Sequence, residues 1–313
     1  MKYYTKDWYV LMQQLNYTAG MQPIADKKYT DAELTKLCSD KIKQEIEHDR
    51  KEYNTPPIKA QINFDKYSPD DFVTFDAKSG VLKKAQSMEE VRKKFEDMYA
   101  ESLEQFNSRP PYDPADTIER FKERYKSDME YGYLRFPEWV KKAADIRLIA
   151  MGYLPESVYK DLEAESVRNA KLYEAINAEA RQQLDKQDIP EEIAKNLMFH
   201  DGEILSFEQV GNDVVMLIHE DCLPYEGQTA YTKVTFKDAE IIERDENLKF
   251  ERRQIEVNGR SCDSYCVWLY EELYKTDDGY KVHMLLSEDG LGYLTIACRD
   301  ICFDFDMEYN EDE

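Results

Sequence analysis

The spacing of apolar residues changes near residue 196, and this change constrains the fold of the 313-residue chain more than any other feature. Upstream, apolar residues recur at the period of an amphipathic helix, as in Leu34, Cys38, Ile42 and Ile46. Downstream, residues 204–209 alternate like a strand with one buried face. Helices followed by strands indicate an α+β fold. We therefore predict a helical domain at 1–195 and an antiparallel β domain at 196–313.

Local signals place helices in the first part. Thr30 with Glu33 and Ser87 with Glu90 each match a capping box, in which two side chains satisfy the free amides at a helix start. The apolar spacing predicts further helices at about residues 6–19, 114–130, 137–151 and 155–186, with a short turn after Pro190. Two proline-containing stretches, 54–80 and 107–113, are predicted to be loops.

Turn signals divide the second part into strands. Gly211–Asp213, Asp277–Gly279 and Asp289–Gly290 predict hairpins, and the economical arrangement is a meander of about six to eight antiparallel strands. Residues 266–274 (CVWLYEELY) are apolar on both faces, as expected of a central strand.

The alternation fails at one position near the C-terminus. Cys298 and Ile301 are both expected to face inward, yet an odd number of steps separates them. A bulge or short bend at Arg299–Asp300 restores the pattern. The bend keeps Cys298 inside and places Cys302, Asp304 and Asp306 on the acidic outer face.

Negative charge is concentrated in the second part. The chain has a net charge of −23, and residues 196–313, with 10 basic and 28 acidic side chains, account for −18 of it. This balance argues against direct binding of nucleic acid or of an anionic membrane, and it favours a basic protein partner. The N-terminus lacks the apolar stretch of a secretion signal, so we expect a cytoplasmic protein with reduced cysteines.

Cysteine and histidine patterns suggest a metal site, and each pattern has a plainer interpretation. Cys262 and Cys266, with His200 as a further candidate, form the weak metal hypothesis, together with the pair Cys298 and Cys302. Because Cys266, Cys298 and Cys302 lie in or beside apolar strands, we expect core or half-buried thiols and no cofactor. Glu45-x-x-His48 matches half of a di-iron signature, but its surroundings are those of a charged helix surface.

His200–Asp201 is the strongest catalytic candidate in the sequence. A histidine followed by a carboxylate can act as a base with its orienting partner, but such a pair needs an activated nucleophile. No nucleophile motif is present in the sequence. We therefore expect these two residues to close the linker before the first strand through bonds to the backbone, and we name no catalytic residue.

Four segments carry a resemblance to a known family: MKYYTKDWY (1–9), MGYLPESVY (151–159), FHDGEILSFE (199–208) and CVWLYEELY (266–274). Together they resemble a family from Gram-positive bacteria and their phages, catalogued as domain of unknown function 4085, whose opening motif has Glu where this chain has Asp7. The resemblance spans both parts of the chain and implies no reaction. The start of the β part is also similar to β domains of bacterial immunity proteins.

These features favour a non-enzymatic binding protein, immunity-like or inhibitor-like, that presents acidic surface to a basic partner. The residues predicted to contact that partner are Glu271, Glu272, Asp304, Asp306 and Glu308. Two alternatives remain open. One is a phage-encoded antagonist that imitates the charge of nucleic acid, and the other is a metal-binding or hydrolytic enzyme that uses His200, Asp201 and the cysteines.

Overall fold

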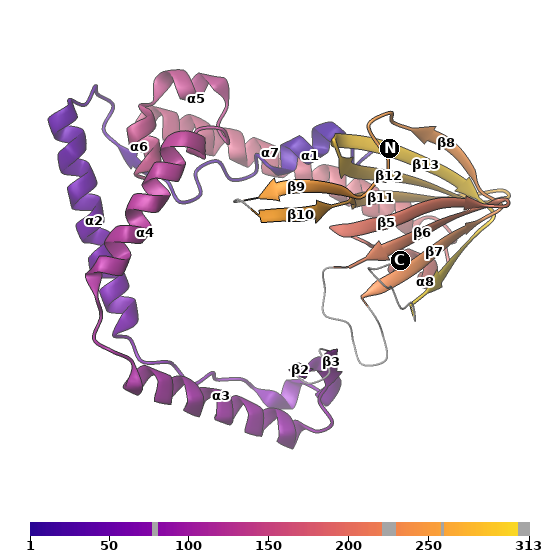
Figure 1. The fold of residues 1–313 in the computed structure, drawn as a ribbon, viewed down its shortest axis with the longest axis horizontal. Coiled ribbons are helices and arrows are strands. Elements are labelled where there is room, and N and C mark those ends of the chain that lie inside the picture. Colours follow the sequence, from indigo (N-terminus) through magenta and orange to yellow (C-terminus); the bar gives the residue numbers. More distant parts are fainter. Residues whose placement is uncertain (77–80, 221–229, 258–259, 306–313) are drawn as a thin grey trace. The chain divides into compact units, whose positions relative to one another are not determined.

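The structure is a computed structural model that describes residues 1–76, 81–220, 230–257 and 260–305. It confirms the α+β class, with helices first and a large antiparallel sheet after them (Figure 1). The chain divides into two compact units. The helical unit comprises Gln13–Phe72 and Ala85–Lys171, and the sheet unit comprises Met1–Met12, Val73–Lys84 and Leu172–Glu313.

The change from helix to strand occurs where the sequence predicts it, between α8 (Glu191–Asn196) and β5 (Gly202–Val210). The boundary between the compact units lies elsewhere. The first twelve residues and the last part of α7 (Glu156–Asp185) belong to the sheet unit. A division at 195/196 therefore separates types of secondary structure but not the compact units.

Capping explains where several helices begin. Thr30 and Glu33 form the predicted capping box at the start of α2, and the Ser87 hydroxyl accepts from the Glu90 amide at the start of α3. The predicted helix at 137–151 is instead two short helices, because Asp145 caps a second start by accepting from the Arg147 amide at 2.9 Å. The helical unit contains α2 (Asp31–Tyr53), α3 (Met88–Ser108), α4 (Pro114–Ser127), α5 (Glu138–Ala143), α6 (Ile146–Ala150), and the parallel strands β1 (Gln22–Ile24) and β4 (Tyr153–Pro155).

The sheet unit is built on an eight-stranded antiparallel sheet with the order β14-β7-β6-β5-β11-β12-β13-β8. Its strands, in addition to β5, are β6 (Asp213–His219), β7 (Tyr231–Lys237), β8 (Glu240–Arg244), β11 (Cys266–Thr276), β12 (Gly279–Glu288), β13 (Gly290–Cys298) and β14 (Asp300–Asp304). The unit also contains helix α1 (Lys6–Met12) and two hairpins, β2–β3 (Val73–Asp76, Val81–Lys84) and β9–β10 (Arg253–Val257, Arg260–Ser264).

The strand order shows that the predicted meander is only partly correct. It holds for β5–β6–β7 and for β11–β12–β13, but β8 pairs with β13 and β14 pairs with β7, at opposite edges of the sheet. The chain crosses between the two edges through Asp238–Ala239 and again through Arg299. The two crossings lie next to each other, because the Arg299 amide donates at 2.8 Å to the carbonyl of Lys237, the residue before Asp238. Connections this short require the sheet to curl until its two edges approach each other at one end. Figure 1 shows the strands converging at that end.

The predicted bend near the C-terminus is confirmed. Arg299 lies between β13 and β14, Cys298 is buried and Cys302 is exposed. The adjacent turn requires glycine. A Cβ at Gly279, whose φ is 154°, would collide with the carbonyl oxygen of Cys298.

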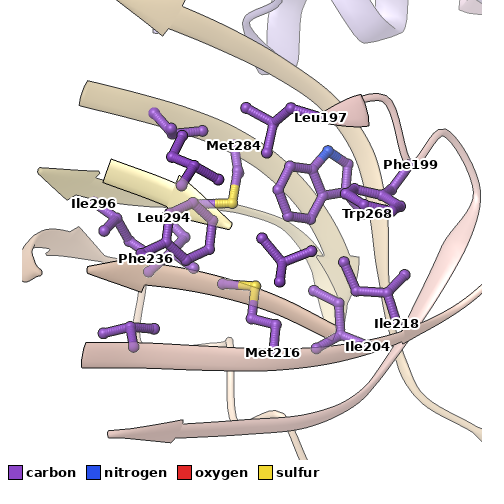
Figure 2. Packing of buried hydrophobic residues seen from close by; sticks show 14 of the residues in the cluster. Leu197, Phe199, Ile204, Met216, Ile218, Phe236, Trp268, Met284, Leu294 and Ile296 are labelled. Atoms are coloured by element: carbon purple, nitrogen blue, oxygen red, sulfur yellow. The ribbon is translucent and has the colours of Figure 1, made fainter. Parts of the chain in front are cut away.

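The main core lies on the inner face of the curled sheet. Alternate residues of β6 and β7 are fully buried there, and Trp268 and Phe199 pack edge to face with ring centroids 5.4 Å apart. Figure 2 shows these two rings with the aliphatic and Met side chains around them. Residues from α8 and the segment after it close this core, including Ile193, Leu197 and Phe199.

The N-terminal segment covers part of the outer face. Trp8 of α1 is 3% exposed and packs against Tyr270 of β11, with ring centroids 4.7 Å apart. The Lys6 ammonium forms an ion pair with Asp245 at 2.7 Å. Strand β11 therefore has packed side chains on both faces, as predicted for residues 266–274, and it lies fifth in the order of eight.

Candidate functional site

A β-bulge in β11 determines where two adjacent carboxylates go. The pairing with β12 shifts between Trp268 and Tyr270, so that Leu269 is an extra residue. After the bulge, Glu271 pairs with Met284, a buried core residue, whereas Glu272 pairs with His283. Because successive residues of a strand point to opposite faces, Glu271 lies on the inner face with Trp268, and Glu272 lies on the outer face.

Glu271 is a half-buried acid with few hydrogen-bonding partners. The indole Nε1 of Trp268 donates to its Oε2 at 2.8 Å. Within the part of the chain that the structure describes, this is the only hydrogen-bond donor to the carboxylate. Loss of hydration on burial raises the pKa of Glu271 to about 7, against the opposing effects of the Trp268 hydrogen bond and the charge of His200.

Glu271 lines a cavity of about 230 Å³ within the sheet unit. The pairing of β11 with β5 ends at Trp268, so the rest of β11 is free to face α7 and α8. In this stretch the backbone of β11 forms hydrogen bonds with the side chain of Gln187. The Gln187 amide donates to the Leu273 carbonyl at 3.1 Å and accepts from the Lys275 amide at 2.6 Å. The cavity walls include Tyr3, Tyr4, Leu184, Leu197, Leu273 and Tyr274, with Arg181 and Met198 among the exposed lining residues.

Glu272 has a structural role that the sequence did not suggest. It is 6% exposed, and its carboxylate accepts from the backbone amides of Lys2, Tyr3 and Tyr4 at 2.6–3.0 Å. The Tyr274 hydroxyl donates to it at 2.8 Å. A buried carboxylate with four donors holds the N-terminal segment on the sheet. A partner contact at Glu272 is therefore not the role that this structure shows for it, because its carboxylate is buried and already bonded.

His200 and Asp201 bond the backbone, as predicted, although their partner strand is β11. His200 Nδ1 lies 2.7 Å from the Leu269 carbonyl oxygen, and the Asp201 amide donates to the Trp268 carbonyl at 2.8 Å. Asp201 adopts a positive φ of 62°, which turns the chain into β5. His200 Nε2 and Asp201 Oδ2 are 3.6 Å apart. The pair thus completes the sheet at the point where β5 begins.

The five cysteines that the structure describes differ in their surroundings. Cys262 is exposed on β10, and Cys266 is fully buried in the core. Burial raises the pKa values of Cys266 and Cys298 to about 12, so both stay protonated thiols at neutral pH. Cys222 lies outside the described residues. No group of three or more His, Cys, Asp or Glu side chains suited to a metal ion occurs among the described residues.

Glu45 and His48 also have separate surroundings. Glu45 forms an ion pair with Arg124 of α4 at 2.6 Å, which joins two helices of the helical unit. His48 is 67% exposed. The half-signature for a di-iron site therefore belongs to a charged helix surface, as the sequence predicts.

The other predicted contact residues lie at the C-terminus. Asp304 is half-buried, with its carboxylate 3.3 Å from the Lys233 ammonium. Asp306 and Glu308 lie outside the described residues. The unit's own cations also neutralise other acids. Ion pairs join Asp213 to Lys237, Asp238 to Arg299, Asp263 to Arg252 and Asp289 to Arg253.

Five aspartates gather at the end of the sheet where the edges approach, and we call this group the turn-end aspartates: Asp213, Asp238, Asp277, Asp278 and Asp300. Hydrogen bonds link the turns that carry them. The Asp238 amide donates to Asp213 Oδ1 at 2.9 Å, and the β11–β12 turn packs on the β13–β14 bend at Gly279. Asp277, Asp278 and Asp300 are exposed. Only the strand order could reveal this group, because the five residues are distributed over four separate turns.

Comparisons with known proteins return no relative. No protein-family model, no curated protein and no solved structure matches the chain. The resemblance to the family catalogued as domain of unknown function 4085 stays a prediction. Among the described residues, no helix combines the length and the apolar character needed to cross a lipid bilayer.

Proposed function

We propose that the protein is a non-enzymatic binding protein, immunity-like or inhibitor-like, that presents the turn-end aspartates to a basic protein partner. The observation that carries this proposal is the convergence of these acidic turns at one end of the sheet, within residues 196–313, which have a net charge of −18. Among the described residues, the cations that form ion pairs with members of the group are Lys237 and Arg299, so acid exceeds base there.

A rigid acidic end suits recognition of a basic surface. A hydrogen bond joins the β5–β6 and β7–β8 turns, and the β11–β12 turn packs on the β13–β14 bend, so the acidic positions lose little freedom when a partner binds. Complementary charge speeds encounter and selects among partners. This surface replaces Glu271 and Glu272 as the proposed contact, while the C-terminal residues Asp306 and Glu308 remain proposed contributors.

The test compares two triple variants with the same change in charge. In the first, Asp277, Asp278 and Asp300 are replaced by Asn. In the control, the exposed residues Glu246, Glu251 and Glu256, which lie away from the turn end in the sequence, are replaced by Gln. Binding of each variant to a lysine-rich peptide, and to any protein captured from a bacterial lysate, is measured over a range of salt concentrations.

We expect the Asn variant to bind about tenfold more weakly than the control and to depend less on salt, because only carboxylates within a Debye length of roughly 8–10 Å of the bound cations contribute strongly to binding. Equal weakening by both triples would mean that net charge matters and the turn end does not. Displacement of a captured host protein by DNA would instead favour the nucleic-acid-mimic hypothesis.

A further inference from the structure

The cavity beside β11 is a second feature, and it is independent of the acidic turn end. Its walls are largely apolar, with Leu184 from α7, Leu197 next to α8 and Leu273 from β11. Three tyrosines complete them: Tyr3, Tyr4 and Tyr274. A concave apolar site with a few polar groups is the usual form of a small-molecule site. Its volume of about 230 Å³ suits a ligand smaller than a typical drug.

The polar groups of the cavity determine the charge that a ligand needs. Glu272 already accepts from four donors, so its carboxylate is occupied by the protein. Glu271 accepts from the Trp268 indole alone among the described residues, which leaves one carboxylate oxygen without a donor. A ligand that brings a positively charged N–H donor would satisfy this oxygen.

The tyrosines favour the same charge. The face of an aromatic ring attracts an ammonium group, and the attraction is greater in a desolvated site. Arg181 is exposed at the cavity, so a ligand anion could interact with it only from the solvent side. The inner groups therefore select a cation with an apolar body.

We propose that this cavity binds a small organic amine, whose primary ammonium group contacts the Glu271 carboxylate and whose short apolar body packs against the leucine and tyrosine side chains.

This assignment predicts binding that depends on pH. Ammonium binding requires ionised Glu271, and burial raises the pKa of that carboxyl to about 7. The charged and titratable groups around it are Tyr3 and Tyr4 of the N-terminal segment, Arg181 of α7, His200 before β5, and Tyr270, Glu272 and Tyr274 of β11. The residues that α8 and its end contribute, Ala194, Leu197 and Met198, do not ionise. The affinity is therefore expected to rise about tenfold from pH 6 to pH 8, as the ionised fraction of Glu271 grows.

The test uses three probes of matched size on the full chain: n-butylamine, 1-butanol and butyrate. The indole N–H resonance of Trp268 reports on the site directly, because this group lies 2.8 Å from the Glu271 oxygen. We expect saturable shifts of this resonance with n-butylamine, and about tenfold weaker binding or none with the other two probes.

Two variants distinguish the effect of the Glu271 carboxylate from the effect of the net charge of the protein. Glu271→Gln keeps an acceptor for the Trp268 indole while removing the charge, so the fold is retained. Glu246→Gln makes the same change of net charge at an exposed loop position. We expect n-butylamine binding to fall at least about tenfold in the first variant and to be unchanged in the second.

Several results would overturn the proposal. They are equal binding of 1-butanol, preferential binding of butyrate, amine binding that survives Glu271→Gln, and absence of any saturable shift with n-butylamine at pH 8. The acidic turn end is not part of this cavity, so such a failure would leave the proposed function in place.

Discussion

Glu271 and Glu272 are adjacent identical residues with opposite surroundings. On the outer face of β11, four donors surround the Glu272 carboxylate and tie the N-terminal segment to the sheet. On the inner face, the Trp268 indole is the one hydrogen-bond donor to Glu271 among the described residues, and the carboxylate borders a cavity. The comparison shows that a run of acids in a sequence does not define an acidic surface, since neither of these two carboxylates serves as one.

Replacing Glu272, whose carboxylate holds the N-terminal segment on the outer face, is expected to have the largest effect on stability. Glu272→Ala leaves the amides of Lys2, Tyr3 and Tyr4 without their acceptor and releases the cover over Tyr270. We expect a loss of about 3–4 kcal/mol in the free energy of unfolding, measured by chemical denaturation. Glu272→Gln, which keeps one acceptor oxygen, is the control and should lose less. A loss below about 1 kcal/mol in the Ala variant would show that the Glu272 carboxylate is not structural.

The inner carboxylate is expected to make stability depend on pH in the opposite way to a salt-bridged acid. Its folded-state pKa is raised from the usual glutamate value of 4.5 to about 7, so the folded state holds this proton more tightly than the unfolded state. The contribution of Glu271 is therefore most favourable below about pH 4.5, declines as pH rises, and levels off above about pH 7.

Glu271→Gln removes this dependence of the free energy of unfolding on pH. Relative to wild type, the variant should gain up to about 3 kcal/mol of stability between pH 5 and pH 8. Denaturation curves of both proteins across that range measure the difference. A constant difference between the two proteins would mean that Glu271 ionises normally.

Trp268→Phe is expected to have an intermediate effect and to sharpen the same comparison. It removes the donor to Glu271 while keeping an aromatic ring in the core beside Phe199. We expect a loss of about 1–2 kcal/mol in the free energy of unfolding. The pKa of Glu271 should also rise further, because the indole hydrogen bond is an influence that lowers it. A lowered pKa in this variant would contradict the described contact.

His200→Ala is expected to have the smallest effect. Its ring accounts for one hydrogen bond to the Leu269 carbonyl and a contact with Tyr270, and the side chain is more than half exposed. We expect a loss of about 1 kcal/mol, measured by thermal unfolding. A loss above about 3 kcal/mol would assign the residue a larger structural part than these contacts explain.

Local patterns in the sequence predicted much of the fold, because their causes are local. The capping residues Thr30 and Ser87 lie at helix starts, and the odd spacing between Cys298 and Ile301 correctly indicated a bend. The same reasoning could have revealed the bulge at Leu269, since the inward residues Trp268 and Leu273 are also separated by an odd number of steps. Placing a bulge there would have predicted that Glu271 lies on the inner face of the sheet.

Other features depend on contacts between distant segments. The pairing of β8 with β13 and of β14 with β7 follows from the curl of the whole sheet, and no local pattern encodes it. The turn-end aspartates come together only through that strand order. The bonds from Lys2, Tyr3 and Tyr4 to Glu272 span about 270 residues, as the separation of 270 between Lys2 and Glu272 shows.

The most direct test of the difference between the two faces is a pH titration of Glu271 followed by the carboxyl ¹³C resonance of that residue, assigned with Glu271→Gln. We predict a midpoint near pH 7, with the Trp268 indole resonance shifting over the same range. A midpoint close to 4.5, the usual value for glutamate, would show that the carboxyl is hydrated and would remove the basis for both the inner site and its ligand.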